Sequence, residues 1–345
     1  MKVLHLLYSD SFSGAENVAC QIIQMMSTQP DLHMAYCSRD GQIKRALKQK
    51  EIEFYPLTDF TIQQIKKVIA QYKPDVIHAH DMRASVAAAF AIKPGIRIVS
   101  HIHNSDFVSR KLSVKSLLYW LANMRISKVL WVSESCFEGY YFHELLKKKS
   151  VILPNVIDAD AVSEKAMSDQ REFDYDIVYV GRLADPKNPL RLIEILKMVQ
   201  TQKADLRVGI VGSGDLEDIT HQAAEAAGLM NNIVFHGFEA NPLKILKSAK
   251  VMVMTSDREG TPMVCLEAMA LGVPIVSTPT DGLCDLVQPG ITGYLENDNQ
   301  IFASRLLSLI TDEMLRQRFS AATLKEFSKI NDIENYRKVL CDAYV

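Results

Sequence analysis

Short apolar runs alternate with helix-length segments along the whole chain, and this alternation constrains the fold more than any other feature. In the first half, runs such as KVLHLLY, DVIHAH and RIVSHIH are separated by helical patterns at 15–26, 62–72 and 113–124. Alternating strands and helices predict a parallel sheet that helices cover on both faces. The first half is therefore expected to be a doubly wound α/β domain.

The same pattern starts again after a polar segment near residues 158–174. Six further strand-like runs follow, from YDIVYVG to GYL. A chain of 345 residues also exceeds the usual size of a single domain. We therefore predict two facing Rossmann-like domains, at 1–160 and 161–327, with a terminal helix at about 328–345 that could pack back on the first. The default ligand site is the cleft between them.

Charge is distributed unevenly, although the net charge is only −2. Residues 1–170 carry 21 Lys and Arg against 17 Asp and Glu, whereas the remainder carries 18 against 24. A basic half predicts contact with anions, such as phosphates or an acidic membrane surface. The near-neutral total gives no sign of nucleic-acid binding.

Six scattered cysteines without a C-x-x-C pair indicate a reduced, cytoplasmic chain. No apolar run reaches the length of a membrane-spanning helix, and the first residues resemble a strand and not a signal peptide. The expected location is the cytoplasm, at most peripheral on the inner face of the membrane.

Two glutamates stand out in the stretch SDREGTPMVCLEAMALGVPIVST. Thr261 as cap and Pro262 as first helical residue predict a helix that begins there, with Glu259 in the preceding loop and Glu267 inside the helix. Backbone N–H groups from Gly260 onward would form an anion site, and the Glu267 carboxylate would suit a vicinal diol. Alternatively, Glu259 complements the helix dipole and Glu267 pairs with a distant cation.

The segment VGRLADPKNP places Arg182 and Lys187 directly after the first strand of the second half. Two cations there could grip phosphates, the arginine in a bidentate manner and the lysine as a point charge. Alternatively, both are ordinary charges of a solvated loop.

Two further glycine turns follow strands of the second half. The turn at Gly212 lacks the third glycine of G-x-G-x-x-G, because Glu217 occupies that place, which argues against a dinucleotide fingerprint. Gly237 and Phe238 follow the next strand, where exposed backbone could contact the edge of a base.

In the first half, Gly14 lies just before a helix, as part of SGAE. Two His-x-His pairs suggest a metal, but alternation along a strand sends such pairs to one face in any β-structure, so we expect no metal. His103, last in its strand, is expected to face the cleft, whereas His78 and His80 are expected to be structural or peripheral.

Taken together, these motifs resemble the retaining glycosyltransferases of family 4, which have the GT-B fold. The stretch from Glu259 to Glu267 matches the E-x7-E element, VGRLADPKNP the phosphate loop, SGAE the N-terminal glycine loop, and SHIHNSD the histidine segment of the catalytic cleft. Two positions depart from the family pattern: Ser13 stands where many members have glycine, and Asp285 where many have glutamate.

The resemblance implies a metal-independent hexosyltransferase that moves a sugar from a nucleotide-diphosphate sugar, with UDP favoured, to a sugar or lipid-linked saccharide. Bacterial capsule, exopolysaccharide or lipopolysaccharide synthesis is the implied setting, with no cofactor besides the donor. Glu267 would hold the ribose, the two cations the diphosphate, and His103 the transferred sugar. The implied catalytic residues are His103, Glu259, Arg182 and Lys187, and the implied donor-binding residues are Gly14, Arg182, Lys187, Gly212, Gly237, Phe238, Glu259, Gly260, Thr261, Pro262 and Glu267.

Other functions remain open alternatives. A nucleotide-sugar epimerase could use the same architecture, although no acid pair stands out in the first half. A non-catalytic nucleotide-sugar sensor would be expected to lack a phosphate cation or one of the glutamates, and neither is lacking. The incomplete glycine fingerprint disfavours an NAD-dependent dehydrogenase.

The stretch SRKLSVKSLLYWLANMRISK combines cations with an apolar centre. A basic helix with interfacial aromatics can lie on anionic lipid. Alternatively, Leu117, Leu118, Trp120 and Leu121 form the buried face of a Rossmann helix.

Overall fold

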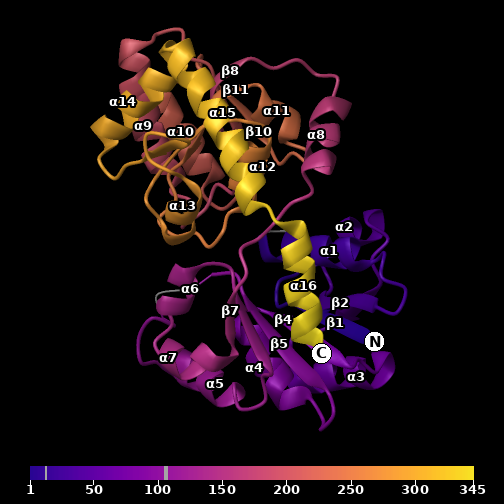
Figure 1. The fold of residues 1–345 in the computed structure, drawn as a ribbon. Helices are drawn as coiled ribbons and strands as arrows, with labels where there is room; N and C mark the ends of the chain where they lie inside the picture. Colours follow the sequence, from indigo (N-terminus) through magenta and orange to yellow (C-terminus); the bar gives the residue numbers. More distant parts are fainter. Residues whose placement is uncertain (12–13, 105–107) are drawn as a thin grey trace. The chain divides into compact units, whose positions relative to one another are not determined.

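The computed structural model describes residues 1–11, 14–104 and 108–345. It divides into two compact units (Figure 1). Unit 1 comprises Met1–Asn155 together with Ile333–Val345, and unit 2 comprises Val156–Asp332. Each unit has its own parallel sheet and its own hydrophobic core.

Unit 1 contains a seven-stranded parallel sheet with the order β3-β2-β1-β4-β5-β6-β7. Six of its strands are predicted by the sequence pattern. The unpredicted strand, β3, carries Pro56, and a proline confines a strand to the edge of a sheet, where β3 lies. The strands are β1 (Lys2–Leu6), β2 (His33–Arg39), β3 (Phe54–Leu57), β4 (Val76–His80), β5 (Arg97–Ile102), β6 (Lys128–Trp131) and β7 (Ser150–Ile152).

Four helices of unit 1 begin at a side-chain cap that the sequence supplies, at Thr61, Asp81, Ser113 and Ser133. Thr61, for example, accepts a hydrogen bond from the backbone N–H of Gln64 before an apolar stripe that includes Ile65 and Ile69. The helices are α1 (Gly14–Met26), α2 (Ile43–Gln49), α3 (Ile62–Tyr72), α4 (Met82–Ala91), α5 (Val114–Ala122), α6 (Glu134–Glu138), α7 (His143–Leu146), the 3₁₀ turn η1 (Lys147–Lys149) and α16 (Ile333–Tyr344).

Unit 2 contains a six-stranded parallel sheet with the order β10-β9-β8-β11-β12-β13, and all six predicted strands are present. The strands are β8 (Tyr175–Val180), β9 (Val208–Val211), β10 (Ile233–Gly237), β11 (Ala249–Met254), β12 (Ile275–Ser277) and β13 (Gly293–Leu295). The helices are α8 (Ala159–Ser168), α9 (Pro189–Gln202), α10 (Glu217–Ala226), α11 (Leu243–Lys247), α12 (Met263–Ala270), α13 (Asp281–Leu286), α14 (Asn299–Thr311) and α15 (Glu313–Ile330).

Each sheet has one position where the strand order reverses. In unit 1 the reversal lies between β1 and β4, and in unit 2 between β8 and β11. Ligands of open α/β sheets bind beyond the carboxyl ends of the strands at such a reversal. The loops after these four strands are therefore the places to search for a site.

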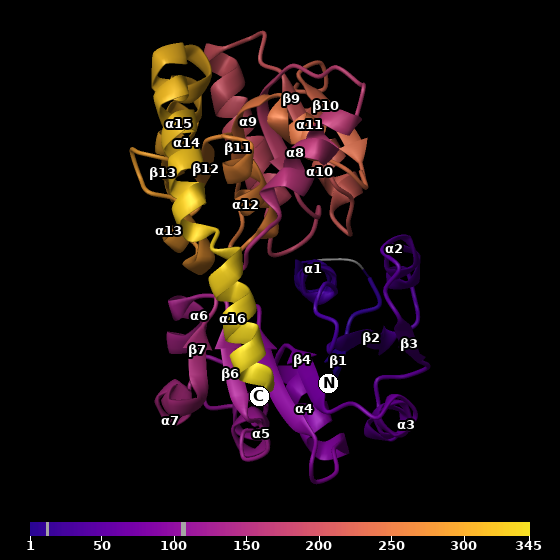
Figure 2. The same cartoon turned by 45° about the vertical axis from the view of Figure 1, so that its right-hand side comes forward.

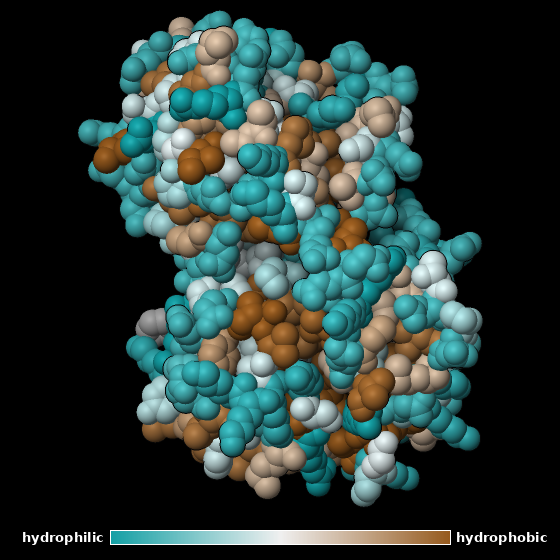
Figure 3. Space-filling view, viewed as in Figure 1, coloured by the Kyte–Doolittle hydropathy of each residue, from teal (hydrophilic) through white to brown (hydrophobic). Residues whose placement is uncertain are grey.

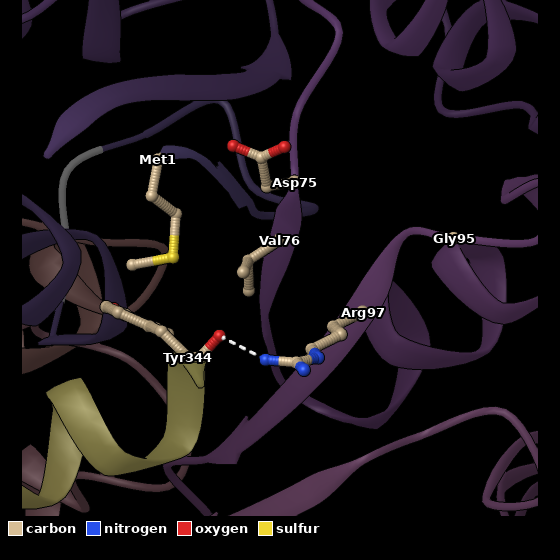
Figure 4. Close-up of a pocket in the computed structure, with 6 residues that line it drawn as sticks. All are labelled: Met1, Asp75, Val76, Gly95, Arg97 and Tyr344. Carbon is tan, nitrogen blue, oxygen red and sulfur yellow. Dashed lines mark hydrogen bonds between the residues drawn. The ribbon is translucent and has the colours of Figure 1, made fainter.

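The final helix, α16, belongs to unit 1. Figure 2 shows it alongside the sheet of that unit, and its buried residues include Leu340 and Tyr344. The carbonyl oxygen of Tyr344 accepts a hydrogen bond of 3.0 Å from the guanidinium of Arg97. This contact lies in a pocket that Asp75 and Val76 also line (Figure 4), at the amino ends of the strands and away from the strand reversal loops.

The described helices include none with the length and apolar character needed to cross a membrane.

Candidate functional site

The loops after β8 and β11 are held together at the strand reversal of unit 2. The hydroxyl of Thr255 donates to the carbonyl oxygens of Lys187 and Asn188, at 3.1 and 3.0 Å. The backbone N–H of Asp257 donates to the carbonyl of Pro186 at 2.8 Å. Two segments that the sequence singled out separately thus form one structural feature.

Lys187 and Glu259 form an ion pair in this feature. Their side chains are only 18% and 11% exposed, so water screens the pair poorly. Both residues were predicted to contact the donor, but their mutual contact was not predicted. A usable signal was present, because opposite charges occur in the loops that follow β8 and β11.

Arg182 follows β8 at the same edge, and its side chain is exposed. Within the described residues it makes no ion pair and no side-chain hydrogen bond. Only its carbonyl oxygen is engaged, by the hydroxyl of Tyr179 at 2.9 Å. The guanidinium therefore remains available for a bidentate contact with an anion.

The glycine turn after β9 packs against the β8 loop. A Cβ atom at Gly212, where φ is +132°, would lie 1.9 Å from the carbonyl oxygen of Gly181, and one at Gly214 would lie 2.4 Å from that of Leu183. Gly212 was predicted to contact a donor; in the structure its backbone contact with the β8 loop accounts for the glycine.

Gly237 ends β10 with a φ of +65°, and its carbonyl oxygen accepts a hydrogen bond of 2.7 Å from the N–H of Gly212. The next residue, Phe238, is 71% exposed. An aromatic ring this exposed, beside the glycine turns, offers a face on which a planar group could stack.

Helix α12 begins at Met263, one residue later than predicted. Pro262 is the N-cap residue and is extended, with ψ of 122°, so Thr261 is not the cap as expected. No side chain of the described residues caps this helix, so its first backbone N–H groups receive no hydrogen bond from a capping side chain.

Gly282, near the start of α13, supports the loop that carries Glu259. A Cβ atom at this position would lie 1.3 Å from the carbonyl oxygen of Gly260, and the N–H of Gly282 faces the carbonyl of Glu259 at 3.4 Å. The sequence indicates a turn at this position, but its contact with the loop that carries Glu259 was not predicted. The close approach is tertiary, so spacing alone could not reveal it.

Glu267 lies in the middle of α12, an apolar helix, and is only partly exposed. Among the described residues it forms no ion pair and no side-chain hydrogen bond. Burial raises the pKa of its carboxyl to about 7, and the charge of Lys165 on α8 only partly opposes this shift. The alternative in which Glu267 is one half of an ion pair therefore has no support in unit 2.

Five histidines gather at the strand reversal of unit 1. Each ring contacts at least two others, which confirms that the two His-x-His pairs lie on one face of the sheet. His78 and His80 are fully enclosed. The five are His5 on β1, His78 and His80 on β4, His101 on β5, and His103, which follows β5.

Two groups within this cluster, each of three histidines, bring ring nitrogens within 4.8 Å of one another. Their facing nitrogens are, however, hydrogen-bonded: His5 to His80 at 3.0 Å and His80 to His103 at 2.8 Å. Two ligands of a tetrahedral zinc ion lie roughly 3.3 Å apart, given bonds of about 2.0–2.1 Å. In this arrangement the facing nitrogens of the two pairs serve as hydrogen-bond partners of each other.

Two further positions of unit 1, Gly14 and Asp81, also follow strands of its sheet. Gly14 is exposed at the start of α1, and nothing described lies within 4 Å of where its Cβ would be; Ser13 lies outside the described residues. Sequence analysis missed Asp81, which follows β4 with a positive φ of 84° and caps α4 through Ala84. Burial raises the pKa of Asp81 to about 6.

Two family models together match nearly the whole chain. Residues 12–161 match Glycosyltransferase Family 4, and residues 163–326 match Glycosyl transferases group 1. Among curated relatives, the chain is 25% identical to the UDP-Gal:alpha-D-GlcNAc-diphosphoundecaprenol alpha-1,3-galactosyltransferase of Escherichia coli, covering 100% of this chain and 97% of the relative. It is also 25% identical to the capsular polysaccharide biosynthesis glycosyltransferase CapM of Staphylococcus aureus, covering 71% and 70%.

A solved structure shows the same fold. The HepE protein of Anabaena, crystallised with UDP, superposes with a TM-score of 0.84 over 99% of both chains at 21% identity. The two parallel sheets and the two family matches therefore lead to the same classification. The chain has the GT-B fold and belongs to glycosyltransferase family 4.

Proposed function

We propose that this glycosyltransferase moves a sugar from a UDP-sugar, with retention of configuration and without a divalent metal, to a sugar or lipid-linked saccharide. The setting we propose is the synthesis of a bacterial capsule, exopolysaccharide or lipopolysaccharide. The observation that carries the proposal is the Glu267 carboxylate, which is partly buried in an apolar helix and has no protein partner among the described residues.

A carboxylate in such a place needs a partner, because burial of an uncompensated charge is costly. The two hydroxyls of a ribose supply two donors to the two carboxylate oxygens. Binding would then favour the ionised form, against the burial that raises its pKa to about 7. Phe238, with its exposed ring, is proposed to stack on the base attached to that ribose, beside the backbone of Gly237.

The diphosphate is proposed to lie between the free guanidinium of Arg182 and Lys187. Lys187 is already paired with Glu259, so phosphate binding would divide its charge between two anions. Directly after Gly260, Thr261 and Pro262, the first backbone N–H groups of α12 add hydrogen-bond donors. These positive groups take the role that a metal has in other transferases, since they stabilise the charge of the leaving diphosphate.

Retention is proposed to proceed by attack from the face that the diphosphate leaves. The bond between the anomeric carbon and the β-phosphate oxygen breaks, and a bond from the acceptor oxygen to the same carbon forms. The acceptor proton passes to the departing phosphate oxygen. Glu259 and His103 would hold hydroxyls of the transferred sugar, Gly14 would approach the donor, and no cofactor enters the reaction.

The names of similar proteins support the choice of donor and acceptor. The HepE structures contain UDP and, in one case, UDP-glucose. The relative from Escherichia coli transfers galactose from a UDP-sugar to a diphosphoundecaprenol-linked sugar. We therefore propose a UDP-sugar donor and a lipid-linked acceptor for this chain.

The test is incubation of the full chain with UDP- and GDP-sugars, with and without saccharide or lipid-linked acceptors. Acceptor-dependent release of UDP, undiminished by EDTA, is expected. Loss of activity in EDTA would show that a metal neutralises the diphosphate. Interconversion of the donor without acceptor would instead favour the epimerase, and binding without any turnover would favour the sensor.

We also propose peripheral contact of unit 1 with an anionic membrane through α5. The helix buries only Ser116, Tyr119 and Ala122. The alternative in which its leucines and tryptophan form a buried face is therefore wrong for this structure. Its exposed apolar side chains are Val114, Leu117, Leu118, Trp120 and Leu121, with Leu112 and Met124 beside its ends.

Exposed cations lie in this helix and in the segments beside it, among them Arg110, Lys111, Lys115 and Arg125. Figure 3 shows apolar residues interspersed with hydrophilic ones on the part of unit 1 where Figure 1 labels α5 and α7. A helix with exposed apolar side chains and exposed cations fits the boundary of an anionic lipid layer, and each cation near the surface contributes about 1 kcal/mol.

Co-sedimentation with phosphatidylglycerol-containing vesicles tests this contact. Binding at low salt that weakens at high salt is expected, because salt screens the cations. The double variant Leu117→Ser/Leu121→Ser should bind less. Ile219→Ser, a change at an equally exposed apolar residue of α10, is the matched control and should bind as the unmodified protein does. No binding at low salt would refute the contact.

A further inference from the structure

The histidine cluster contains two separate hydrogen-bonded chains of rings. In the first, His5 Nδ1 faces His80 Nε2 at 3.0 Å, and His80 Nδ1 faces His103 Nε2 at 2.8 Å. In the second, the Tyr344 hydroxyl faces His78 Nδ1 at 2.8 Å, and His78 Nε2 faces His101 Nδ1 at 3.2 Å. Among the described residues, no hydrogen bond joins the two chains.

The strand register explains this arrangement. His5 lies opposite His78, and His80 lies opposite His101, in the parallel pairs of β1 with β4 and β4 with β5. The hydrogen bonds run diagonally, from each ring to the ring two residues further along the next strand. The first chain therefore crosses the sheet from β1 toward the carboxyl end of β5, where His103 lies.

The rings of the first chain are placed for hydrogen bonding along their edges. Those of His80 and His103 are within 8° of parallel, with centroids 5.1 Å apart. The facing nitrogens, His80 Nδ1 and His103 Nε2, are closer to each other than the planes of two stacked rings can be. The two rings therefore meet edge to edge through this hydrogen bond. Such a bond needs one protonated and one bare nitrogen.

Proton counting then couples the three rings. Burial lowers the pKa of His5 and His103 to about 3 and that of His80 well below its usual value, so each ring is neutral and carries one N–H. Two of the three protons occupy the two hydrogen bonds, and the third lies at one end, on His5 Nε2 or His103 Nδ1. Both end nitrogens are shielded from solvent, and neither has a hydrogen-bond partner within residues 1–11, 14–104 and 108–345.

The more exposed end suits the unpaired N–H better. His5 is fully buried, whereas His103 is only partly buried. Orphaned buried N–H groups are rarer than orphaned acceptors, so the spare proton is favoured on His103, the less completely enclosed of the two end residues. His5 and His80 would then each donate through Nδ1, and His103 would keep its own proton on Nδ1.

We propose that His80, supported by His5, is a positioning residue that holds His103 as the Nδ1–H tautomer, so that His103 donates a hydrogen bond to an oxygen of the sugar in transfer. The functional half of this inference rests on the proposed function. The tautomer itself does not, and it can be measured without substrate.

The experiment is long-range proton–nitrogen NMR of the full chain with ¹⁵N-labelled histidine, which distinguishes protonated from bare ring nitrogens. In the unmodified protein, His103 is expected to be protonated at Nδ1 and bare at Nε2. In His80→Gln the proton should distribute over both nitrogens. His78→Gln is the matched control, because His78 is equally buried on the same strand but bonds only within the second chain.

Kinetics with UDP-glucose test the consequence for transfer. His80→Gln should lower kcat about tenfold, the equivalent of one hydrogen bond, with little change in KM. His78→Gln should change kcat less than about twofold beyond any loss of folded protein. If His80→Gln does not fold, His5→Phe takes its place as the test variant, because it breaks the chain one ring further from His103.

Three results would overturn the proposal: a His103 that is bare at Nδ1 in the unmodified protein, equal shifts of its tautomer in the two variants, or an altered tautomer with unchanged kcat. A chain that releases no nucleotide from any sugar donor would refute the proposed function instead, while the NMR result would still decide the tautomer.

Discussion

Unit 1 and unit 2 share one plan, a parallel sheet whose strand order reverses beside its first strand, yet they place different polar groups at the reversal. In unit 1, five imidazoles lie largely within the sheet itself, and burial lowers their pKa values. In unit 2, Lys187 and Glu259 lie in loops above the strands, and Glu267 lies on the following helix.

The difference follows from the cost of burial. A neutral imidazole can be enclosed once its nitrogens are hydrogen-bonded, whereas an ion needs a partner or water. Neutral rings can therefore lie at the level of the strands, where they bind a polar group through the direction of a hydrogen bond. Charged groups stay in loops, where they can meet a charged ligand. The five predictions that follow test this contrast, from the largest expected effect to the smallest.

Lys187→Met should lower kcat by about 100-fold or more, because one donor to developing charge contributes about 2.7–4 kcal/mol. The matched control is Lys250→Met, which removes the cation of another partly buried pair, to Asp176 at 2.8 Å, near the amino ends of the same two strands. That variant should lose stability and keep its kcat. Steady-state kinetics, corrected for the amount of folded protein, measure kcat in both variants. An equal loss of kcat in the two would contradict the contrast between the carboxyl and amino ends of the sheet.

Gly282→Ala should destabilise unit 2 by about 3 kcal/mol, at the upper end of overpacking, because the added carbon meets the Gly260 carbonyl oxygen at 1.3 Å. Gly14→Ala, also near the start of a helix but in unit 1, should cost less than about 0.5 kcal/mol, since nothing described lies near it. Urea denaturation measures both. A tolerated alanine at Gly282 would show that the loop carrying Glu259 can move freely.

Glu267→Gln should weaken binding of UDP by roughly 1.5–3 kcal/mol, the usual contribution of hydrogen bonds to a charged group, while the fold survives. Titration calorimetry with UDP measures the change. Glu296→Gln, which alters a carboxylate of unit 2 that already has a partner in Arg305, is the control and should bind UDP normally. Unchanged affinity in Glu267→Gln would remove the ribose assignment.

The two units should respond to pH with opposite signs. Histidines with lowered pKa values stabilise unit 1 above about pH 6.5, and this contribution is lost as the pH falls below it. Glu267, with its pKa raised from 4.5 to about 7, stabilises unit 2 most below about pH 4.5 and loses that contribution as the pH rises through about 7. Each titrating group contributes on the order of 2 kcal/mol between pH 5 and 7, and the contributions of the histidines add.

Both tryptophans, Trp120 and Trp131, lie in unit 1, so their fluorescence reports its unfolding alone. Hydrogen exchange of peptides from α12 reports on unit 2. Glu267→Gln should flatten the pH dependence of α12 exchange and leave the fluorescence transition unchanged. The same sign of response in both units would contradict the contrast.

Tyr344→Phe should destabilise unit 1 by about 1 kcal/mol, the net value of one hydrogen bond, because His78 Nδ1 loses its partner. Tyr141→Phe, at a largely exposed ring of the same unit, should have no measurable effect. Thermal unfolding followed by tryptophan fluorescence compares them. Equal transitions would show that α16 is held by apolar packing and not by this contact.

Much of the fold could be predicted from local pattern. Apolar runs of strand length identified twelve of the thirteen strands, since parallel strands are covered on both faces and are nearly continuous in apolar residues. The exception, β3, was hidden by Pro56, which is tolerated because β3 forms the edge of the sheet. The start of α12 was also misplaced by one residue, because Pro262 suits either the first helical position or the extended cap.

The sequence by itself determined the two-sheet plan, the family, and the loops that carry Arg182, Lys187, Glu259 and Glu267. These signals are local, because spacing along one strand and the loop after it sets them. Only the tertiary structure decided that Lys187 meets Glu259, that Gly282 lies under Gly260, that Glu267 has no partner among the described residues, and that five histidines form two chains. Each of these depends on strand order and register, which bring together residues far apart in the sequence, so spacing along the chain could not show them.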